Sequence, residues 1–172
     1  MRLKLLLLAL MFISPSLLAE RFCEAYITDE WPDARYEINT ADEVVLDVVT
    51  GLMWKRCSEG LSGENCETGI PFLRGWSAAL AIPQTLNLTG FAEYTDWRLP
   101  NIEELRSIAA INCDSPAINE VAFPNTDPLL FWTSTAIRHD HSPAWNLNFR
   151  RGESIPANSG AGSYVRLVRT PN

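Results

Sequence analysis

The sequence predicts an α+β domain, and three observations support that prediction. Residues 74–86 and 101–110 carry apolar side chains at helical spacing. Residues 129–134, 144–149 and 164–169 favour strands, and the last two segments alternate apolar with polar side chains. Four cysteines predict a small domain stapled by disulfides. Helices followed by several strands indicate two helices beside a twisted, mostly antiparallel sheet.

Residues 1–19 have the layout of a secretory signal peptide. Arg2 and Lys4 precede nine apolar residues, and the small residue Ala19 ends the segment. The apolar run is shorter than the roughly 20 residues that span a bilayer, so we expect cleavage rather than a membrane anchor. The rest of the chain, 20–172, is then a single exported domain, located in the periplasm or outside the cell.

The mature chain is acidic. Without Arg2 and Lys4, its 153 residues hold 12 basic and 21 acidic side chains, a formal charge of −9. Such a surface repels phosphate and sulfate groups, so nucleic acid is not expected as a partner and sulfated polysaccharides are poor ligands. No second long apolar run follows the signal, so we expect no membrane contact after cleavage.

The four cysteines are Cys23, Cys57, Cys66 and Cys113, and three pairings are open to them. Cys57 and Cys66 enclose a short stretch rich in glycine and serine that closes easily, so we expect a disulfide between them. Cys23 then pairs with Cys113 by elimination. A zinc site is the alternative, but the spacing lacks the CxxC pattern typical of such sites, and no metal or other cofactor is expected.

A β-hairpin is expected before the first disulfide loop. Residues 36–39 form a short strand, and the β-branched residues 44–48 form a better one. Thr50-Gly51 is typical of a tight turn, after which residues 52–55 return as a further strand.

Two helices are predicted in the middle of the chain. In residues 74–86 the apolar side holds Trp76, Ala79, Leu80 and Pro83, and the proline is expected near the helix end.

The second helix, residues 101–110, follows the loop 90–96. Asn101 is a good N-cap and Glu104 has the spacing of a capping box. The segment 116–128 is expected to be irregular.

In the last third, Trp145, Leu147 and Phe149 alternate with two asparagines, which predicts a half-buried strand.

A series of short motifs then appears in a fixed order. They are TGLMWKR (50–56), GW (75–76), DWRLPN (96–101) with EL (104–105), SPAIN (115–119), FPNT (123–126), FWTST (131–135), AW (144–145) and YVRLVR (164–169). From about Tyr36 to Arg169 the chain resembles the Lcl C-terminal domain family, named for the C-terminal domain of a bacterial collagen-like adhesin. The resemblance implies a C-type-lectin-like fold related to formylglycine-generating-enzyme-like domains, and it agrees with the cysteine pairing above.

The motif side chains are interpreted as structural. Tryptophans bury large apolar areas, so the four in motifs are assigned to the core rather than to sugar stacking: Trp54, Trp97, Trp132 and Trp145. Arg98, Arg166 and Arg169 are expected to form buried pairs with Asp96 or Glu104.

The sequence contains few residues with the chemistry of an active site. His139, Asp140 and His141 have metal-ligand chemistry, but a polar loop tip between strands is the preferred interpretation. The Glu-Pro-Asn and Gln-Pro-Asp tripeptides of calcium-dependent lectins are absent. Asn112, Asp114 and Asp127 remain as candidate oxygen ligands for calcium. No catalytic constellation is recognised, so no enzymatic activity is expected.

The leading hypothesis is a secreted or periplasmic recognition or adhesion domain that binds a carbohydrate or a surface protein. Its expected binding loops are residues 138–142 and 150–162, because loops on a rigid scaffold commonly carry function. The candidate side chains are Arg138, His139, Asp140, His141, Arg150 and Arg151. One alternative is a structural or assembly subunit of a surface complex. The other is an enzyme related by fold to formylglycine-generating oxidases, which would need a free thiol.

Overall fold

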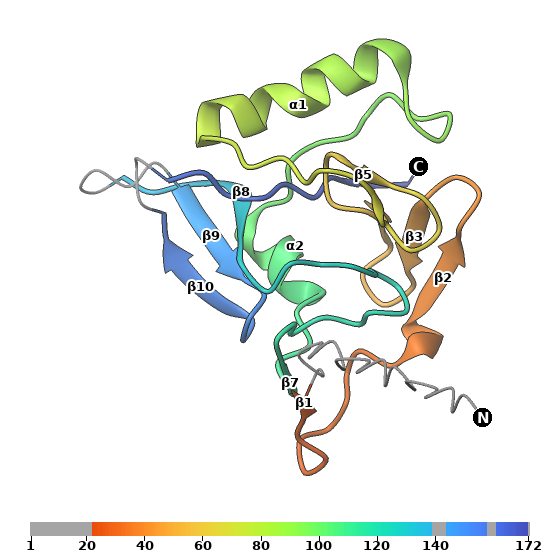
Figure 1. Ribbon diagram of the computed structural model, residues 1–172, viewed down its shortest axis with the longest axis vertical. Helices are drawn as coiled ribbons and strands as arrows, with labels where there is room; N and C mark the ends of the chain where they lie inside the picture. The colour runs from red at the N-terminus through yellow and green to blue at the C-terminus, as the bar shows by residue number, and fades with distance from the viewer. Residues whose placement is uncertain (1–21, 139–143, 158–160, 172) are drawn as a thin grey trace, which may run out of the picture.

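The computed structural model describes residues 22–138, 144–157 and 161–171, and it has an α+β architecture (Figure 1). In chain order its elements are β1 (Phe22–Cys23), a 3₁₀ helix (Asp33–Arg35), β2 (Tyr36–Asn39), β3 (Val44–Asp47), β4 (Leu52–Lys55), β5 (Leu61–Ser62), β6 (Thr68–Gly69), α1 (Trp76–Thr89), α2 (Ile102–Ser107), β7 (Cys113–Asp114), β8 (Leu130–Ala136), β9 (Ala144–Asn148), β10 (Glu153–Pro156) and β11 (Val168–Arg169).

The larger sheet has the strand order β11-β4-β3-β2, and its pairs are antiparallel. Strands β3 and β4 form the predicted hairpin, with Val45 opposite Trp54. Gly51 closes the turn between them at a φ of +71°, a left-handed conformation that glycine adopts without steric cost.

A second antiparallel sheet has the order β10-β9-β8, and a register shift interrupts the β8–β9 pairing between Trp132 and Ala136. Strand β10 was not predicted, because its sequence Glu-Ser-Ile-Pro has neither an apolar run nor a clean alternation. It is an edge strand that ends in proline, a residue tolerated at edges because it has no N–H to donate.

Helix α1 confirms the predicted element but corrects its end. Pro83 lies inside the helix, which continues to Thr89 and is capped by Gly90. Both Ala79 and Pro83 are buried, so the proline ring is held on the packed face of the helix. Burial of the ring therefore keeps the proline in the helix despite the lost hydrogen bond.

Helix α2 is shorter than predicted. Its capping box is present: the Asn101 side chain accepts from the Glu104 N–H, and the Glu104 carboxylate accepts from the Asn101 N–H. The helix ends at Ser107 rather than at residue 110. Ala110 donates its N–H to the Ala117 carbonyl, which draws the chain into a bridge with the irregular segment.

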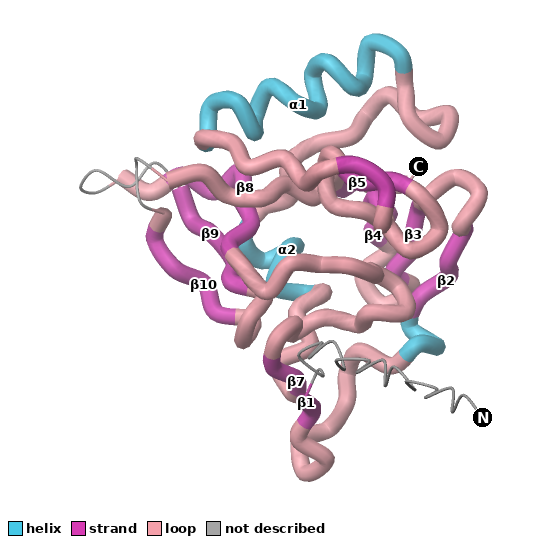
Figure 2. The backbone as a smooth tube through the Cα atoms, in the orientation of Figure 1, coloured by secondary structure: helices cyan, strands magenta, loops and turns pink. Residues whose placement is uncertain are grey.

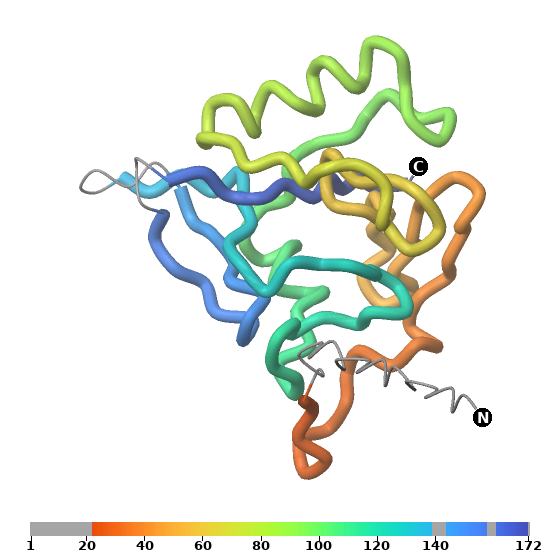
Figure 3. Tube along the Cα trace, viewed as in Figure 1, coloured from red at the N-terminus to blue at the C-terminus, as the bar shows by residue number. Residues whose placement is uncertain are grey.

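The predicted last strand, 164–169, is divided between the two sheets. The Tyr164 N–H bonds to the Leu130 carbonyl beside β8, and only Val168–Arg169 pair with β4. The segment therefore crosses from one sheet to the other, as the blue end of the trace shows (Figure 3), and joins them.

Two main hydrophobic clusters lie on opposite faces of the strands. Because successive strand side chains point to opposite faces, Val45 and Phe131 enter the cluster beside α2, while Val44 and Trp132 enter the cluster beside α1. The two helices lie on different sides of the strands (Figure 2). Of the four motif tryptophans, three are buried, whereas Trp145 is only half-buried and belongs to neither cluster.

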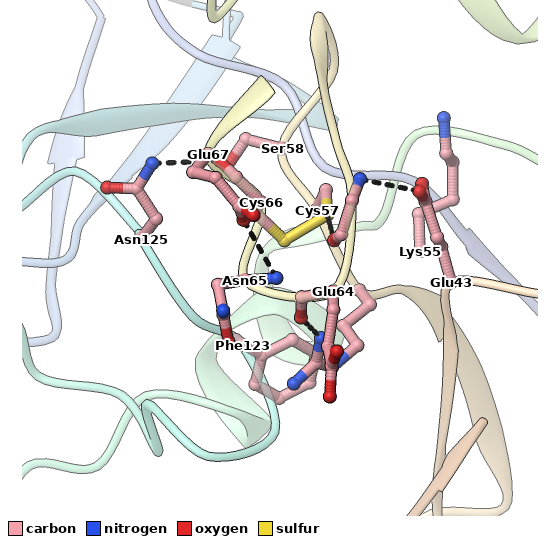
Figure 4. The surroundings of a disulfide bond; sticks show 12 residues. Glu43, Lys55, Cys57, Ser58, Glu64, Asn65, Cys66, Glu67, Phe123 and Asn125 are labelled. Atoms are coloured by element: carbon pink, nitrogen blue, oxygen red, sulfur yellow. Dashed lines mark hydrogen bonds between the residues drawn. A yellow bond between two sulfur atoms is a disulfide. The ribbon is translucent and has the colours of Figure 1, made fainter. Parts of the chain in front are cut away.

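Both disulfides pair the cysteines as expected, Cys23 with Cys113 and Cys57 with Cys66. The first joins β1 to β7 where the two cysteines face each other in the register. The second closes a loop that Glu43 and Asn125 anchor from other parts of the chain (Figure 4). None of the helices in the described part of the chain is long and apolar enough to cross a membrane. Two disulfides suggest an oxidising, non-cytoplasmic environment.

Candidate functional site

The two predicted binding loops begin at opposite ends of strand β9. Arg138 follows β8 near the start of β9, whereas Arg150 and Arg151 lie in the turn between β9 and β10. His139, Asp140 and His141 lie outside the described residues. The structure therefore does not bring the described candidates together into one site. A pocket lined by described residues lies beside the turn with the two arginines.

That turn holds its conformation through its own polar groups. Asn148 accepts the Gly152 N–H on its carbonyl at 2.8 Å and the Arg150 N–H on its side-chain oxygen at 2.9 Å. Gly152 has a φ of +72°, and a Cβ there would lie 3.0 Å from a side-chain carbon of Ile111. The turn therefore packs tightly on the segment that precedes β7.

Arg151 points from the turn toward β7. Its Nε lies 3.0 Å from Oδ2 of Asp114, and this ion pair is half exposed to solvent. A second contact joins the same segments, because the Ser115 N–H bonds to the Arg150 carbonyl at 2.9 Å. The position of Arg151 is thus set by β7 as well as by its own turn.

Between this turn and the β1–β7 pair lies a cavity of about 360 Å³, which we call the Arg151 pocket. Its lining residues are Phe22, Glu24, Ile111, Asn112, Cys113, Asp114, Arg151 and Glu153. Arg150 is not among them. The Cys23–Cys113 disulfide links β1 to β7, and the Glu24 N–H donates to the Asn112 carbonyl at 2.7 Å.

Asn112 is the most unusual residue of the pocket. Its side chain is buried, yet no described residue donates a hydrogen bond to Oδ1. A buried acceptor without a donor is unfavourable by about 1–3 kcal/mol. Such a group is a candidate for completion by a ligand or an ordered water.

The rim of the pocket combines apolar and charged groups. Phe22 and Ile111 are exposed, although large apolar side chains are usually covered. Three carboxylates, Glu24, Asp114 and Glu153, face one guanidinium, so the lining is acidic overall. This arrangement favours neutral or cationic ligands over anionic ones.

The other predicted arginines are structural. Arg98 forms two hydrogen bonds of 2.7 Å with Glu104, and Arg169 bonds both carboxylate oxygens of Asp96. The acidic partners are those expected, but the pairs are not fully buried, because Arg98 and Asp96 are partly exposed. Burial opposes ionisation of Glu104, but the hydrogen bonds from Arg98 and Asn101 outweigh it and lower the pKa of the carboxyl. The Arg169 hydrogen bonds likewise lower the pKa of Asp96.

Arg166 corrects the prediction of an acidic partner. It is fully buried and donates to the carbonyls of Lys55 and Arg56 and to the hydroxyls of Ser58 and Thr126. Burial lowers the pKa of Arg166 to about 9, against the attraction of Glu59. This arginine joins three segments of the core.

Two residues of the Arg151 pocket carry a different prediction from the sequence. Asn112 and Asp114 were considered as calcium ligands together with Asp127, which does not line this pocket. Within the described ranges no group of three or more histidine, cysteine or acidic residues could hold a metal ion. The sequence did not identify Phe22, Glu24 and Ile111 as pocket residues. The one signal for them was their position in the chain close to Cys23 or Cys113, which the disulfide brings together.

The family comparison agrees with the motifs. The family model of the Lcl C-terminal domain matches residues 43–169, about three quarters of the chain. A search of curated proteins finds no match. The family is not known as catalytic. The chain belongs to the Lcl C-terminal domain family.

Proposed function

We propose that the chain is exported after removal of residues 1–19 and that residues 20–172 form a single recognition domain, which binds an uncharged carbohydrate in the Arg151 pocket. The family suggests an adhesion-related role, and the two disulfides fit an oxidising compartment. The single observation that carries the proposal is one pocket lined both by Asn112, whose buried Oδ1 has no donor among the described residues, and by the exposed aromatic ring of Phe22.

Carbohydrate chemistry fits the groups that line this pocket. A sugar hydroxyl both donates and accepts hydrogen bonds. Asn112 and the carboxylates supply acceptors, and Arg151 supplies donors in a planar fork. The face of Phe22 offers a surface on which the C–H groups of a sugar ring can pack. The acidic lining disfavours sulfated or phosphorylated sugars.

The C-type-lectin-like architecture is part of the same proposal. Two helices, short antiparallel sheets and a disulfide that ties the N-terminal strand to the middle of the chain agree with it. The proposal also includes a non-enzymatic role. The alternative enzyme class needs a free thiol, whereas all four cysteines are in disulfides and the described residues contain no free cysteine.

The test compares two adjacent arginines. The mature protein, with both disulfides formed, is screened on an array of neutral, amino and acidic glycans, and the best ligand is titrated by calorimetry. Arg151→Ala should weaken binding about 10-fold or more, because it removes charge-assisted hydrogen bonds. Arg150→Ala is the matched control in the same turn and should retain the wild-type affinity.

Two results would overturn the proposal. One is an array without any signal above background, which would remove carbohydrate as the ligand class. The other is a ligand whose affinity falls equally in both arginine variants or in neither, which would move the site away from the pocket.

A further inference from the structure

Helix α1 exposes a second apolar face. Its inner face packs on the cluster beside it, but Ala78, Ala81, Thr85 and Leu88 all point to solvent, and Leu88 is 84% exposed. Their spacing of three, four and three residues is that of the contact positions of a coiled coil. The helix contains no charged residue. A helix exposed to water typically carries charged or polar side chains along its outer face, and this face of α1 offers only Thr85.

A groove of about 520 Å³ runs along three of these four positions, Ala78, Ala81 and Thr85. Phe72, Ala78, Ala81, Ile82 and Leu86 give it an apolar lining. The one charged residue in its lining is Glu59, and Lys55 neutralises it, because Nζ lies 2.7 Å from Oε1.

Phe72 of the groove stands in a segment with two further exposed apolar side chains, Ile70 at 80% and Leu73 at more than half. The apolar surface therefore extends beyond the helix. Exposed apolar patches of this kind mark interaction surfaces.

The charge distribution limits what can cover this surface. Residues 68–92 contain one charged side chain, Arg74, whereas the mature chain as a whole holds 12 basic and 21 acidic residues. Two copies that each carry a charge of −9 repel one another over most of their surfaces. The face of α1 lets two copies approach without bringing unpaired carboxylates together, since Glu59 is paired with Lys55.

We propose that two copies of the chain associate through α1, with the helices antiparallel about a two-fold axis. In this arrangement Leu88 of one copy lies over Ala78 of the other, and Thr85 lies over Ala81, so a large side chain meets a small one at each end. The flanking positions Ser77 and Gln84 carry no charge that would select a different partner.

Sedimentation analysis of the mature, disulfide-bonded chain from about 1 to about 100 µM tests the association, since this range covers weak dimers. We expect a dimer that forms more readily at high salt, because salt screens the like charges. Leu88→Glu should weaken dimerisation about 10-fold or more, because the carboxylate would be buried without a partner.

Tyr26→Glu is the matched control. Tyr26 is an equally exposed apolar side chain in the segment after β1, which lies at the far end of the molecule from α1 (Figure 1). This variant adds the same charge and should leave the dimer intact.

A second variant tests the orientation. Ala78→Lys combined with Leu88→Glu should restore the dimer, because the antiparallel arrangement brings the new lysine of one copy beside the new glutamate of the other. A wild-type chain that stays monomeric at all concentrations, or a dimer that Leu88→Glu leaves unchanged, would overturn the proposal. Failure of rescue in a folded double variant would overturn the antiparallel pairing. Glycan binding at the Arg151 pocket is a separate readout that Leu88→Glu should not change.

Discussion

At the residue scale, Arg166 is the clearest case of a charged side chain used as a structural connector. Its guanidinium lies 5.0 Å from the centre of the Phe123 ring and donates to two backbone carbonyls and two hydroxyls. Arginine suits this position because its planar fork serves several acceptors at once and stacks on an aromatic ring.

Replacing Arg166 by alanine should lower the free energy of unfolding by about 3 kcal/mol or more, because several buried acceptors lose their donor. Urea unfolding with the disulfides intact measures this loss. Arg150→Ala, an exposed change of the same kind, should stay within about 0.5 kcal/mol of the wild type. A loss below about 1 kcal/mol for Arg166→Ala would mean that water replaces the missing donors.

The hydrogen-bond partners of Arg166 could not be predicted from the sequence. Alternation along the last strand correctly indicated that Arg166 and Arg169 are held within the fold. Asp96 and Glu104 were the predicted acidic partners of these arginines, and Arg169 bonds Asp96. Arg166 bonds to backbone carbonyls, which every residue carries, so no residue type in the sequence identifies these partners.

At the scale of elements, the turn between α1 and α2 stores backbone strain. Phe91 and Tyr94 exchange two backbone hydrogen bonds of 2.9 and 3.0 Å, and the two residues between them, Ala92 and Glu93, have φ values of +51° and +66°. Two-residue turns with two positive φ values strongly prefer asparagine and glycine. Neither residue of this turn belongs to that class.

Glu93→Gly should therefore stabilise the protein by about 1 kcal/mol, because glycine adopts a positive φ without steric cost. Glu103→Gly is the matched control: the same substitution falls inside α2 and should destabilise by about 1 kcal/mol. Thermal unfolding of the two variants separates the effects by sign. A loss of stability in Glu93→Gly would show that contacts of the glutamate side chain outweigh the strain.

The start of α2 could be predicted better than the ends of α1 and α2. The capping box placed the start of α2 correctly because a cap is a local interaction between Asn101 and Glu104. Its end was placed too late because Ala110 bonds to Ala117 across a loop. The end of α1 was placed too early, because burial of Pro83 against the core outweighs the local preference of proline.

At the scale of the whole molecule, the two disulfides close loops of very different length. Cys23 and Cys113 are 90 residues apart, whereas Cys57 and Cys66 are nine apart. If a crosslink stabilises mainly by restricting the unfolded chain, the longer loop gives the larger effect.

Replacing Cys23 and Cys113 by alanine should lower the free energy of unfolding by about 4–5 kcal/mol, against about 2.5–3 kcal/mol for the Cys57 and Cys66 pair. Urea unfolding of both double variants measures the difference. An equal or reversed order would mean that native contacts of the short loop, such as the bond from Asn125 to the Cys66 carbonyl, outweigh the entropy of the longer one.

The sequence by itself determined the α+β class, the family, the hairpin, both helices, the helix cap and the pairing of the cysteines. These features depend on local periodicity, on caps and turns, or on the order of motifs along the chain. Only the tertiary structure decided that residues 164–169 join two sheets, that Asn112 and Arg151 line one pocket, and that α1 carries a second apolar face. Each of these depends on which distant segments pack together, and long-range packing leaves no local pattern in the sequence.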